Sequence, residues 1–152
     1  MVVINQACDA NSVEVSAADV AKIPVSNMRV SRAEFVALWQ TAERLHDDQL
    51  RRGVPDWYGA GVVETCRWLA IVEPKTGPWQ LAPSPVTRRV HVAYDDLIEG
   101  ECQAAVQLAG RRPVPARLMS RPGWIDGVVA TLNWAWRRLG SPPLGTIRSA
   151  SG

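Results

Sequence analysis

The sequence lacks the short motifs that most nucleotide, metal and ester chemistry requires. It contains no P-loop, no dinucleotide-binding glycine fingerprint, no HExxH, no GxSxG and no EF-hand loop. Its three cysteines, Cys8, Cys66 and Cys102, are odd in number and far apart, and no CxxC or close Cys–His pair occurs. We therefore expect no metal site and no cofactor. Enzymatic activity is unsupported, although a site assembled from residues distant in sequence would leave no such motif.

Long apolar runs and secretory signals are absent as well. No stretch of about 18 apolar residues occurs, and the chain does not open with a basic stretch followed by an apolar one. We therefore expect no membrane span and a cytoplasmic protein with reduced thiols. Tyrosine and phenylalanine are scarce, with two and one residues, whereas tryptophan occurs seven times. Tryptophan is frequent both in small cores and at protein interfaces.

The charge is distributed unevenly along the chain. The formal net charge is +2, but residues 1–80 carry eight basic and ten acidic residues, and residues 81–152 carry nine and five. A basic C-terminal region is suited to an acidic partner or to a phosphate backbone. No recognisable nucleic-acid-binding motif accompanies it, and only two of the seventeen basic residues are lysines. The candidate nucleic-acid contacts are Arg88, Arg89, Arg117 and Arg121.

Helix start and stop signals predict a mainly α fold, a small single-domain bundle of about four helices. We expect helices near 32–52, 56–72, 93–109 and 121–139. Ser31 and Glu34 form a capping box before the first of them, Gly53 ends it, and Asp56 is a good N-cap for the second. The predicted core includes Trp39, Leu69, Ile98, Leu132 and Trp136.

The helical domain is expected to span residues 31–143. Residues 1–30 are expected to form an irregular N-terminal arm in which Ser16 begins one or two helical turns, and residues 144–152 a disordered tail. Residues 73–91 contain four prolines and are expected to form a long connecting loop. We find no internal repeat.

Three tryptophans lie in the last predicted helix. At about 100° per residue, Trp134 and Trp136 point about 200° apart, so one buried face cannot hold both. Trp136 falls on the apolar stripe. Either Trp134 docks the N-terminal arm or the proline-rich loop, which we favour, or it is an exposed anchor beside two arginines. The candidate partner-binding residues are Trp134, Arg137, Arg138, Arg111 and Arg112.

Glu101 lies inside the apolar face of the third predicted helix. A carboxylate there must be paired, hydrogen-bonded, protonated or placed at a pocket. We expect a structural contact, with Arg67, Arg88, Arg89 or an indole N–H as its partner. The alternative is a pocket that binds a cationic ligand between acidic and aromatic side chains. That candidate pocket would be lined by Trp57, Glu64, Trp68 and Glu101.

Three hypotheses of different classes follow. The first, which we favour, is a non-enzymatic accessory or adaptor protein that binds another protein within a larger assembly, through the last helix and its flanking loops. The second is a nucleic-acid-associated factor that uses an arginine-rich C-terminal surface. The third is a protein with the ligand-binding pocket described above.

Overall fold

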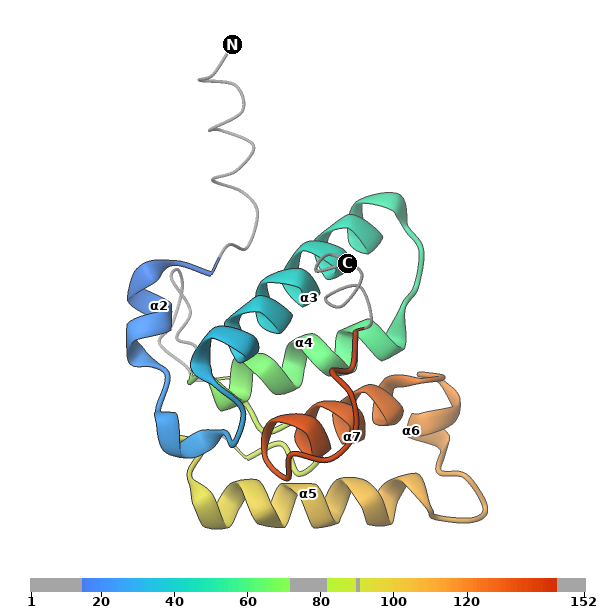
Figure 1. The fold of residues 1–152 in the computed structure, drawn as a ribbon. Coiled ribbons are helices and arrows are strands. Elements are labelled where there is room, and N and C mark those ends of the chain that lie inside the picture. Colours follow the sequence, from blue (N-terminus) through green and yellow to red (C-terminus); the bar gives the residue numbers. More distant parts are fainter. Residues whose placement is uncertain (1–14, 72–81, 90, 145–152) are drawn as a thin grey trace.

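A computed structural model describes residues 15–71, 82–89 and 91–144, which are mainly helical and contain no strand (Figure 1). The mainly α prediction is therefore confirmed. The predictions for residues 1–14, for residue 72 at the end of the second predicted helix, for residues 73–81 and 90 of the proline-rich loop and for residues 145–152 of the tail fall outside the described residues. The elements are α2 (Ala17–Lys22), the 3-10 helix η1 (Val25–Asn27), α3 (Arg32–Arg52), α4 (Trp57–Leu69), α5 (Asp95–Ala109), α6 (Ala116–Met119) and α7 (Trp124–Ala135).

Local signals fix the beginning and end of α3 and the beginning of α4, as predicted. The hydroxyl of Ser31 accepts from the backbone N–H of Glu34 at 3.1 Å, and the Glu34 carboxylate accepts from the N–H of Ser31 at 3.2 Å. Gly53 ends α3 with a left-handed φ of 68°. The Asp56 carboxylate caps α4 by accepting from the N–H of Gly59 at 3.1 Å.

The long helices are stacked in the order α3, α4, α7, α5 (Figure 1). The chain runs one way along α3 and α5 and back along α4 and α7, so α3–α4 and α5–α7 form two helical hairpins. The inner helices α4 and α7 have neighbours on both sides, which is why both carry more than one buried face. All five predicted core residues are buried.

The two inner helices share a short sequence repeat, so the expectation that the chain has none is wrong. GVVETCRW begins at Gly61 in α4 and GVVATLNW begins at Gly127 in α7, and five of the eight residues are identical. Thr65 donates its hydroxyl proton to the Gly61 carbonyl oxygen at 2.8 Å, and Thr131 donates to that of Gly127 at 2.8 Å. The two segments therefore have the same local structure.

The two repeats pack against each other through their glycines. A Cβ at Gly61 would lie 2.3 Å from the carbonyl oxygen of Trp124, and a Cβ at Gly127 would lie 2.2 Å from that of Tyr58. These distances are shorter than real Cβ contacts, so only glycine permits this approach of two backbones. Because Tyr58 and Trp124 stand three residues before the respective glycines, the contact is symmetric.

Helix α7 is shorter than predicted. The expected range was 121–139, but the helix begins at Trp124 after Gly123, whose φ is 94°, and ends at Ala135. Residues 116–119 form the separate helix α6, and the chain turns before α7 starts.

The described part of the N-terminal arm belongs to the bundle. Ser16 caps α2 as predicted, and Ile23, Met28 and Val30 are buried, so the core begins before residue 31. The backbone N–H of Arg29 donates to the carbonyl oxygen of Ala135 at 2.6 Å, and its guanidinium lies 4.2 Å from the centroid of the Trp136 ring. The arm therefore closes over the end of α7.

Candidate functional site

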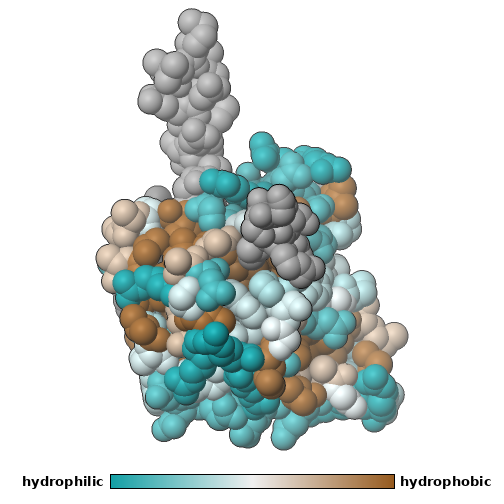
Figure 2. All heavy atoms as spheres, in the orientation of Figure 1, coloured by the Kyte–Doolittle hydropathy of each residue, from teal (hydrophilic) through white to brown (hydrophobic). Residues whose placement is uncertain are grey.

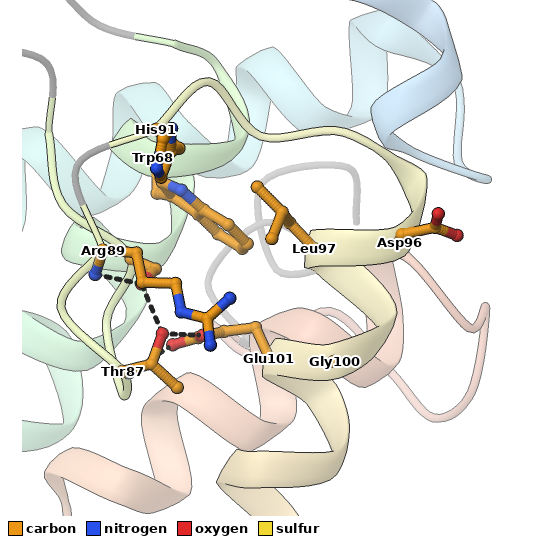
Figure 3. A pocket seen from close by; sticks show the side chains of 9 residues that line it. Trp68, Thr87, Arg89, His91, Asp96, Leu97, Gly100 and Glu101 are labelled. Atoms are coloured by element: carbon orange, nitrogen blue, oxygen red, sulfur yellow. Dashed lines mark hydrogen bonds between the residues drawn. The ribbon is translucent and has the colours of Figure 1, made fainter.

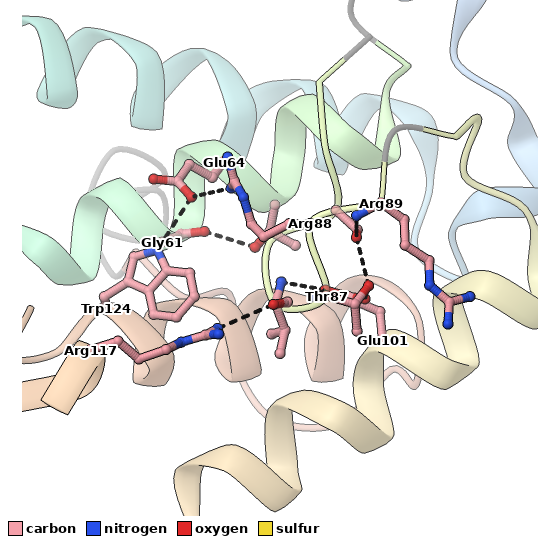
Figure 4. Close-up of polar contacts among 11 residues, drawn as sticks. Gly61, Glu64, Thr87, Arg88, Arg89, Glu101, Arg117 and Trp124 are labelled. Atoms are coloured by element: carbon pink, nitrogen blue, oxygen red, sulfur yellow. Dashed lines mark hydrogen bonds and ion pairs between the residues drawn. The ribbon is translucent and has the colours of Figure 1, made fainter. Parts of the chain in front are cut away.

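Residues 82–89, which we call the Ser84 loop, form a compact turn among α4, α5, α6 and α7. Ser84 and Arg89 bond through both backbone groups and side chain: the Ser84 N–H donates to the Arg89 carbonyl, and the Arg89 N–H donates to the Ser84 hydroxyl, each at 2.9 Å. Arg88 has a left-handed φ of 60°. The side chains of Arg88 and Arg89 point to opposite sides of the loop (Figure 4).

Glu101 of α5 holds the Ser84 loop in place. Its carboxylate is 3% exposed and accepts hydrogen bonds from the backbone N–H of Val86, from the N–H of Thr87 at 3.0 Å and from the Thr87 hydroxyl at 2.9 Å. The contact is structural, as expected, but none of the predicted partners makes it. Because its oxygens are occupied by the loop, Glu101 does not offer a free carboxylate to a cationic ligand.

A hollow of about 460 Å³ lies on the Arg88 side of the loop. We call it the arginine hollow. Pro83 and Pro85 of the loop form part of its wall. The side chains that determine its chemistry are Arg67, Arg88, Arg117, Arg121, Glu64 and Trp124.

Two of these arginines are already paired with carboxylates. Arg67 binds Glu43 of α3 through two hydrogen bonds of 2.8 and 2.7 Å, and these bonds are the main cause of its raised pKa. Arg88 lies 3.9 Å from Glu64, whose carboxylate also accepts from the indole N–H of Trp124 at 3.3 Å. The positive charges of Arg67 and Arg88 are therefore largely balanced inside the protein.

The other two arginines of the hollow are held by groups without a negative charge. Arg117 donates to the carbonyl oxygen of Val86 at 3.2 Å, and its guanidinium lies 5.6 Å from the centroid of the Trp124 ring (Figure 4). Arg121 lies 5.8 Å from the same ring and 5.6 Å from that of Trp57. Neither has an ion pair among the described residues, so the hollow carries an excess of positive charge.

A second, smaller pocket of about 130 Å³ lies on the Arg89 side of the loop (Figure 3). We call it the Trp68 pocket. The four residues predicted to share one pocket are thus divided by the Ser84 loop. Trp68 and Glu101 line the Trp68 pocket, Glu64 lines the arginine hollow, and Trp57 lines neither.

The predicted partner-binding surface around Trp134 is not formed. Trp134 is 5% exposed, because α7 is covered on two sides, so its interpretation as an exposed anchor is wrong. Arg137 binds Glu99 of α5 at 2.9 Å, and Arg138 donates to the carbonyl oxygen of Arg29 at 3.1 Å. The two remaining residues of the predicted set are Arg111 and Arg112. They follow the C-terminal end of α5, away from the end of α7 that carries Arg137 and Arg138.

Three of the four predicted nucleic-acid contacts, Arg88, Arg117 and Arg121, do come together in the arginine hollow, whereas Arg89 points away from it. Sequence reasoning did not assign Arg67 or Trp124 to this site. Trp124 looks like an ordinary core residue of its helix. Only the placement of the Ser84 loop brings Arg67 to the same hollow.

The described parts of the chain can be searched for a membrane-spanning helix and for a metal site. No helix there has the length and hydropathy to cross a bilayer. No group of three or more His, Cys, Asp or Glu side chains gathers there in a way that would hold a metal ion. Comparisons with protein-family models, with curated proteins and with solved structures find no match to this chain.

Proposed function

We propose that this protein is a non-enzymatic binding module, an accessory or adaptor protein of a larger assembly that accepts an acidic segment of another protein into the arginine hollow. One observation carries the proposal. Four guanidinium groups line the hollow, and two of them, those of Arg117 and Arg121, have no carboxylate partner among the described residues. A segment with two or more carboxylates would supply the missing negative charge.

The chemistry of the hollow matches such a segment. A guanidinium binds a carboxylate through two parallel N–H donors, and this pairing is stronger and more directional than that of an ammonium. Arg121 is positioned against two indole rings, which limits the conformational entropy that it loses on binding. The half-buried Pro83 in the wall of the hollow provides an apolar contact for the rest of the segment.

The distribution of arginines favours a protein partner over a nucleic acid. A phosphate backbone is bound by several basic residues that follow its path. Here Arg89 faces the other side of the loop, and Arg137 and Arg138 are bonded within the fold. Arg117 and Arg121 are therefore grouped at one hollow and do not form a continuous basic path with these residues, which suits a short acidic segment better than a continuous strand.

The face of the molecule shown in Figure 2 has no broad apolar patch among its described residues. On the face shown in Figure 2, the coloured hydrophobic residues lie in small patches separated by hydrophilic ones. A broad apolar patch of the kind that marks many protein interfaces is not seen among the described residues of that face.

The test is a binding titration with a short fluorescent peptide rich in Glu and Asp, compared with single-stranded and duplex DNA of equal charge. We expect the peptide to bind more tightly than either DNA at about 150 mM salt. We expect the double substitution Arg117→Ala and Arg121→Ala to weaken peptide binding by tenfold or more, about 1.4 kcal/mol.

A matched control is provided by Arg51→Ala with Arg52→Ala. These arginines lie at the end of α3 and pair with Asp47 and Asp48, so the same charge is removed away from the hollow. An equal loss of affinity in the control would show that only net charge matters. Tighter binding of DNA than of the peptide would favour the nucleic-acid hypothesis and overturn the proposal.

The proposal includes a cytoplasmic location, where thiols stay reduced. Two of the three cysteines lie in the described residues, and both Cys66 and Cys102 are free and buried. Burial is the main cause of a raised pKa in both thiols, and it brings the pKa of Cys102 to about 12. Both thiols are therefore protonated and poorly reactive at neutral pH.

A further inference from the structure

The four arginines of the arginine hollow differ in how firmly their present partners hold them. Arg67 forms two hydrogen bonds of 2.8 and 2.7 Å with Glu43, whose side chain is 1% exposed. Breaking a bidentate pair with a buried carboxylate is costly, so we expect Arg67 to stay with Glu43 when a ligand binds. Arg117 and Arg121 have no carboxylate partner among the described residues and are available to a ligand at once.

Arg88 is held much more loosely than Arg67. Its guanidinium lies 3.9 Å from the carboxylate of Glu64, which is too far for a hydrogen bond. The side chain of Arg88 is 58% exposed and that of Glu64 is 34% exposed, so water screens the attraction between them. Arg88 can therefore leave Glu64 for the carboxylate of a ligand without breaking a hydrogen bond between the two side chains.

Glu64 is placed where a carboxylate of a ligand would be useful to the hollow. It lies in α4, lines the hollow and accepts from the indole N–H of Trp124 at 3.3 Å (Figure 4). The hydrogen bonds to Glu43 are the main cause of the raised pKa of Arg67, and the negative charge of Glu64 contributes to it as well. Glu64 therefore already supplies the kind of charge that the acidic segment would bring.

A carboxylate that reaches Arg88 meets two costs. It must replace the attraction between Arg88 and Glu64, and it then lies close to the carboxylate of Glu64, which repels it. No such costs arise at Arg117 and Arg121, which are held by a carbonyl oxygen and by indole rings. The net gain in affinity from Arg88 should therefore be smaller than the gain from either of these arginines.

We propose that Glu64 is an internal competitor of the acidic segment, because it holds Arg88 in the free protein and must be displaced before the segment can contact that guanidinium. Arg117 and Arg121 make the first contacts with the segment. Glu64 thereby keeps the affinity of the hollow below the value that its arginines alone would give. This inference rests on the proposed function, since it names the residue that limits binding at the same site.

The test compares two Glu-to-Gln variants of the full chain in titrations with a fluorescent hexaglutamate peptide. Glu64→Gln should bind the peptide at least about fivefold more tightly than the wild type, because it removes the competing charge while its amide oxygen can still accept from Trp124. Glu34→Gln removes the same charge at the start of α3, and glutamine also suits a capping box. Its affinity should differ from that of the wild type by less than about twofold.

The outcomes separate this inference from the proposed function. Melting curves show whether both variants are folded. If the wild type binds the peptide and Glu64→Gln binds it no more tightly than Glu34→Gln, the inference is overturned and the proposed function stands. If neither the wild type nor Glu64→Gln binds the peptide, the proposed function fails and the inference fails with it.

A double-mutant cycle tests the competition for Arg88 itself. Arg88→Gln should weaken hexaglutamate binding at least about fivefold in the Glu64→Gln background, but less than about twofold in the otherwise unchanged protein, where Glu64 holds Arg88 back. An equal loss in the two backgrounds would contradict the competition.

A comparison that needs no change at Glu64 completes the test. In the otherwise unchanged protein, Arg121→Gln should weaken hexaglutamate binding at least about threefold, more than Arg88→Gln does, because no carboxylate competes for Arg121. Both substitutions remove one positive charge from the lining of the same hollow. A loss from Arg88→Gln as large as that from Arg121→Gln would overturn the inference.

Discussion

In each of the two helical hairpins, a glutamate carboxylate binds an indole N–H and a guanidinium, but the two clusters differ in how deeply they are buried. In the α3–α4 hairpin, the carboxylate of Glu43 accepts from the indole N–H of Trp39 at 2.9 Å and from the guanidinium of Arg67. In the α5–α7 hairpin, Glu99 accepts from the indole N–H of Trp136 at 2.9 Å and from the guanidinium of Arg137 at 2.9 Å. The side chain of Glu43 is 1% exposed, whereas that of Glu99 is 44% exposed.

The difference shows that burial, more than geometry, determines what such a cluster contributes. Water solvates each exposed charge almost as well as the oppositely charged partner does, so an exposed ion pair adds little to the free energy of unfolding. A buried carboxylate that loses its cation has no alternative partner, so disrupting the pair is strongly destabilising. The hydrogen-bond distances in the two clusters are similar, but the buried cluster should contribute more to the free energy of unfolding than the exposed one.

The largest expected effect is that of Glu43→Gln. The substitution leaves the half-buried Arg67 without its carboxylate, and we expect a loss of about 3–5 kcal/mol in the free energy of unfolding, measured with urea. Replacing both members, Glu43→Leu with Arg67→Met, should recover much of that loss because no charge remains to be desolvated. A Glu43→Gln protein as stable as the wild type would contradict the assigned role of this cluster.

The next largest loss of stability is expected at the glycine contact between α4 and α7, which joins the two hairpins. Gly127→Ala and Gly61→Ala each place a methyl group against a carbonyl oxygen of the other helix, and we expect losses of about 1–3 kcal/mol by thermal unfolding. The control is Gly100→Ala, which meets nothing and should add about 0.5–1 kcal/mol. If Gly127→Ala were also stabilising, the backbones of α4 and α7 would not approach as described.

A more local effect is expected from Glu101→Gln. The backbone N–H groups of Val86 and Thr87 both donate to one carboxylate oxygen, which the amide can retain as a weaker, uncharged acceptor, whereas its NH2 group replaces the oxygen that accepts from the Thr87 hydroxyl. We expect a loss of about 1–2 kcal/mol, with faster hydrogen exchange at these two amides than at those of α4. Unchanged exchange at Val86 and Thr87 would show that Glu101 does not anchor the Ser84 loop.

The smallest effect is that of Glu99→Gln, for which we expect less than about 1 kcal/mol at low salt and less still at high salt. The hydrogen bond from Trp136, followed by that from Arg137, lowers the pKa of Glu99. Its contribution is therefore present above the usual pKa of about 4.3 and is lost as the pH falls through the lower folded value. A variant with the same acid unfolding curve as the wild type would show that Glu99 contributes nothing.

Sequence signals predicted those parts of the fold that depend on neighbouring residues. The capping box of Ser31 and Glu34, the stop at Gly53 and the cap at Asp56 each act within one helical turn, so the ends that they define were predicted correctly. The core positions Trp39 and Leu132 follow from helical periodicity in the same way.

Features that depend on contacts between helices could not be predicted. Trp134 lies opposite the apolar stripe and is nevertheless buried, because α7 is enclosed on two sides. Glu101 was correctly expected to have a structural partner, but that partner is the backbone of a loop about fifteen residues away in sequence, whose path no local signal reveals. The arginine hollow depends on the same loop.

The contact between the arm and α7 also determines when the protein can complete its fold during synthesis. Arg29 and Arg138, which bond to each other, are 109 positions apart. A ribosome that has made the arm must therefore add most of the remaining chain before the end of α7 is available to receive it. Until then the arm, which contributes Ile23 and Met28 to the core, lacks that contact, so a nascent chain that stalls before α7 has an incomplete core that is open to chaperones and to other nascent chains.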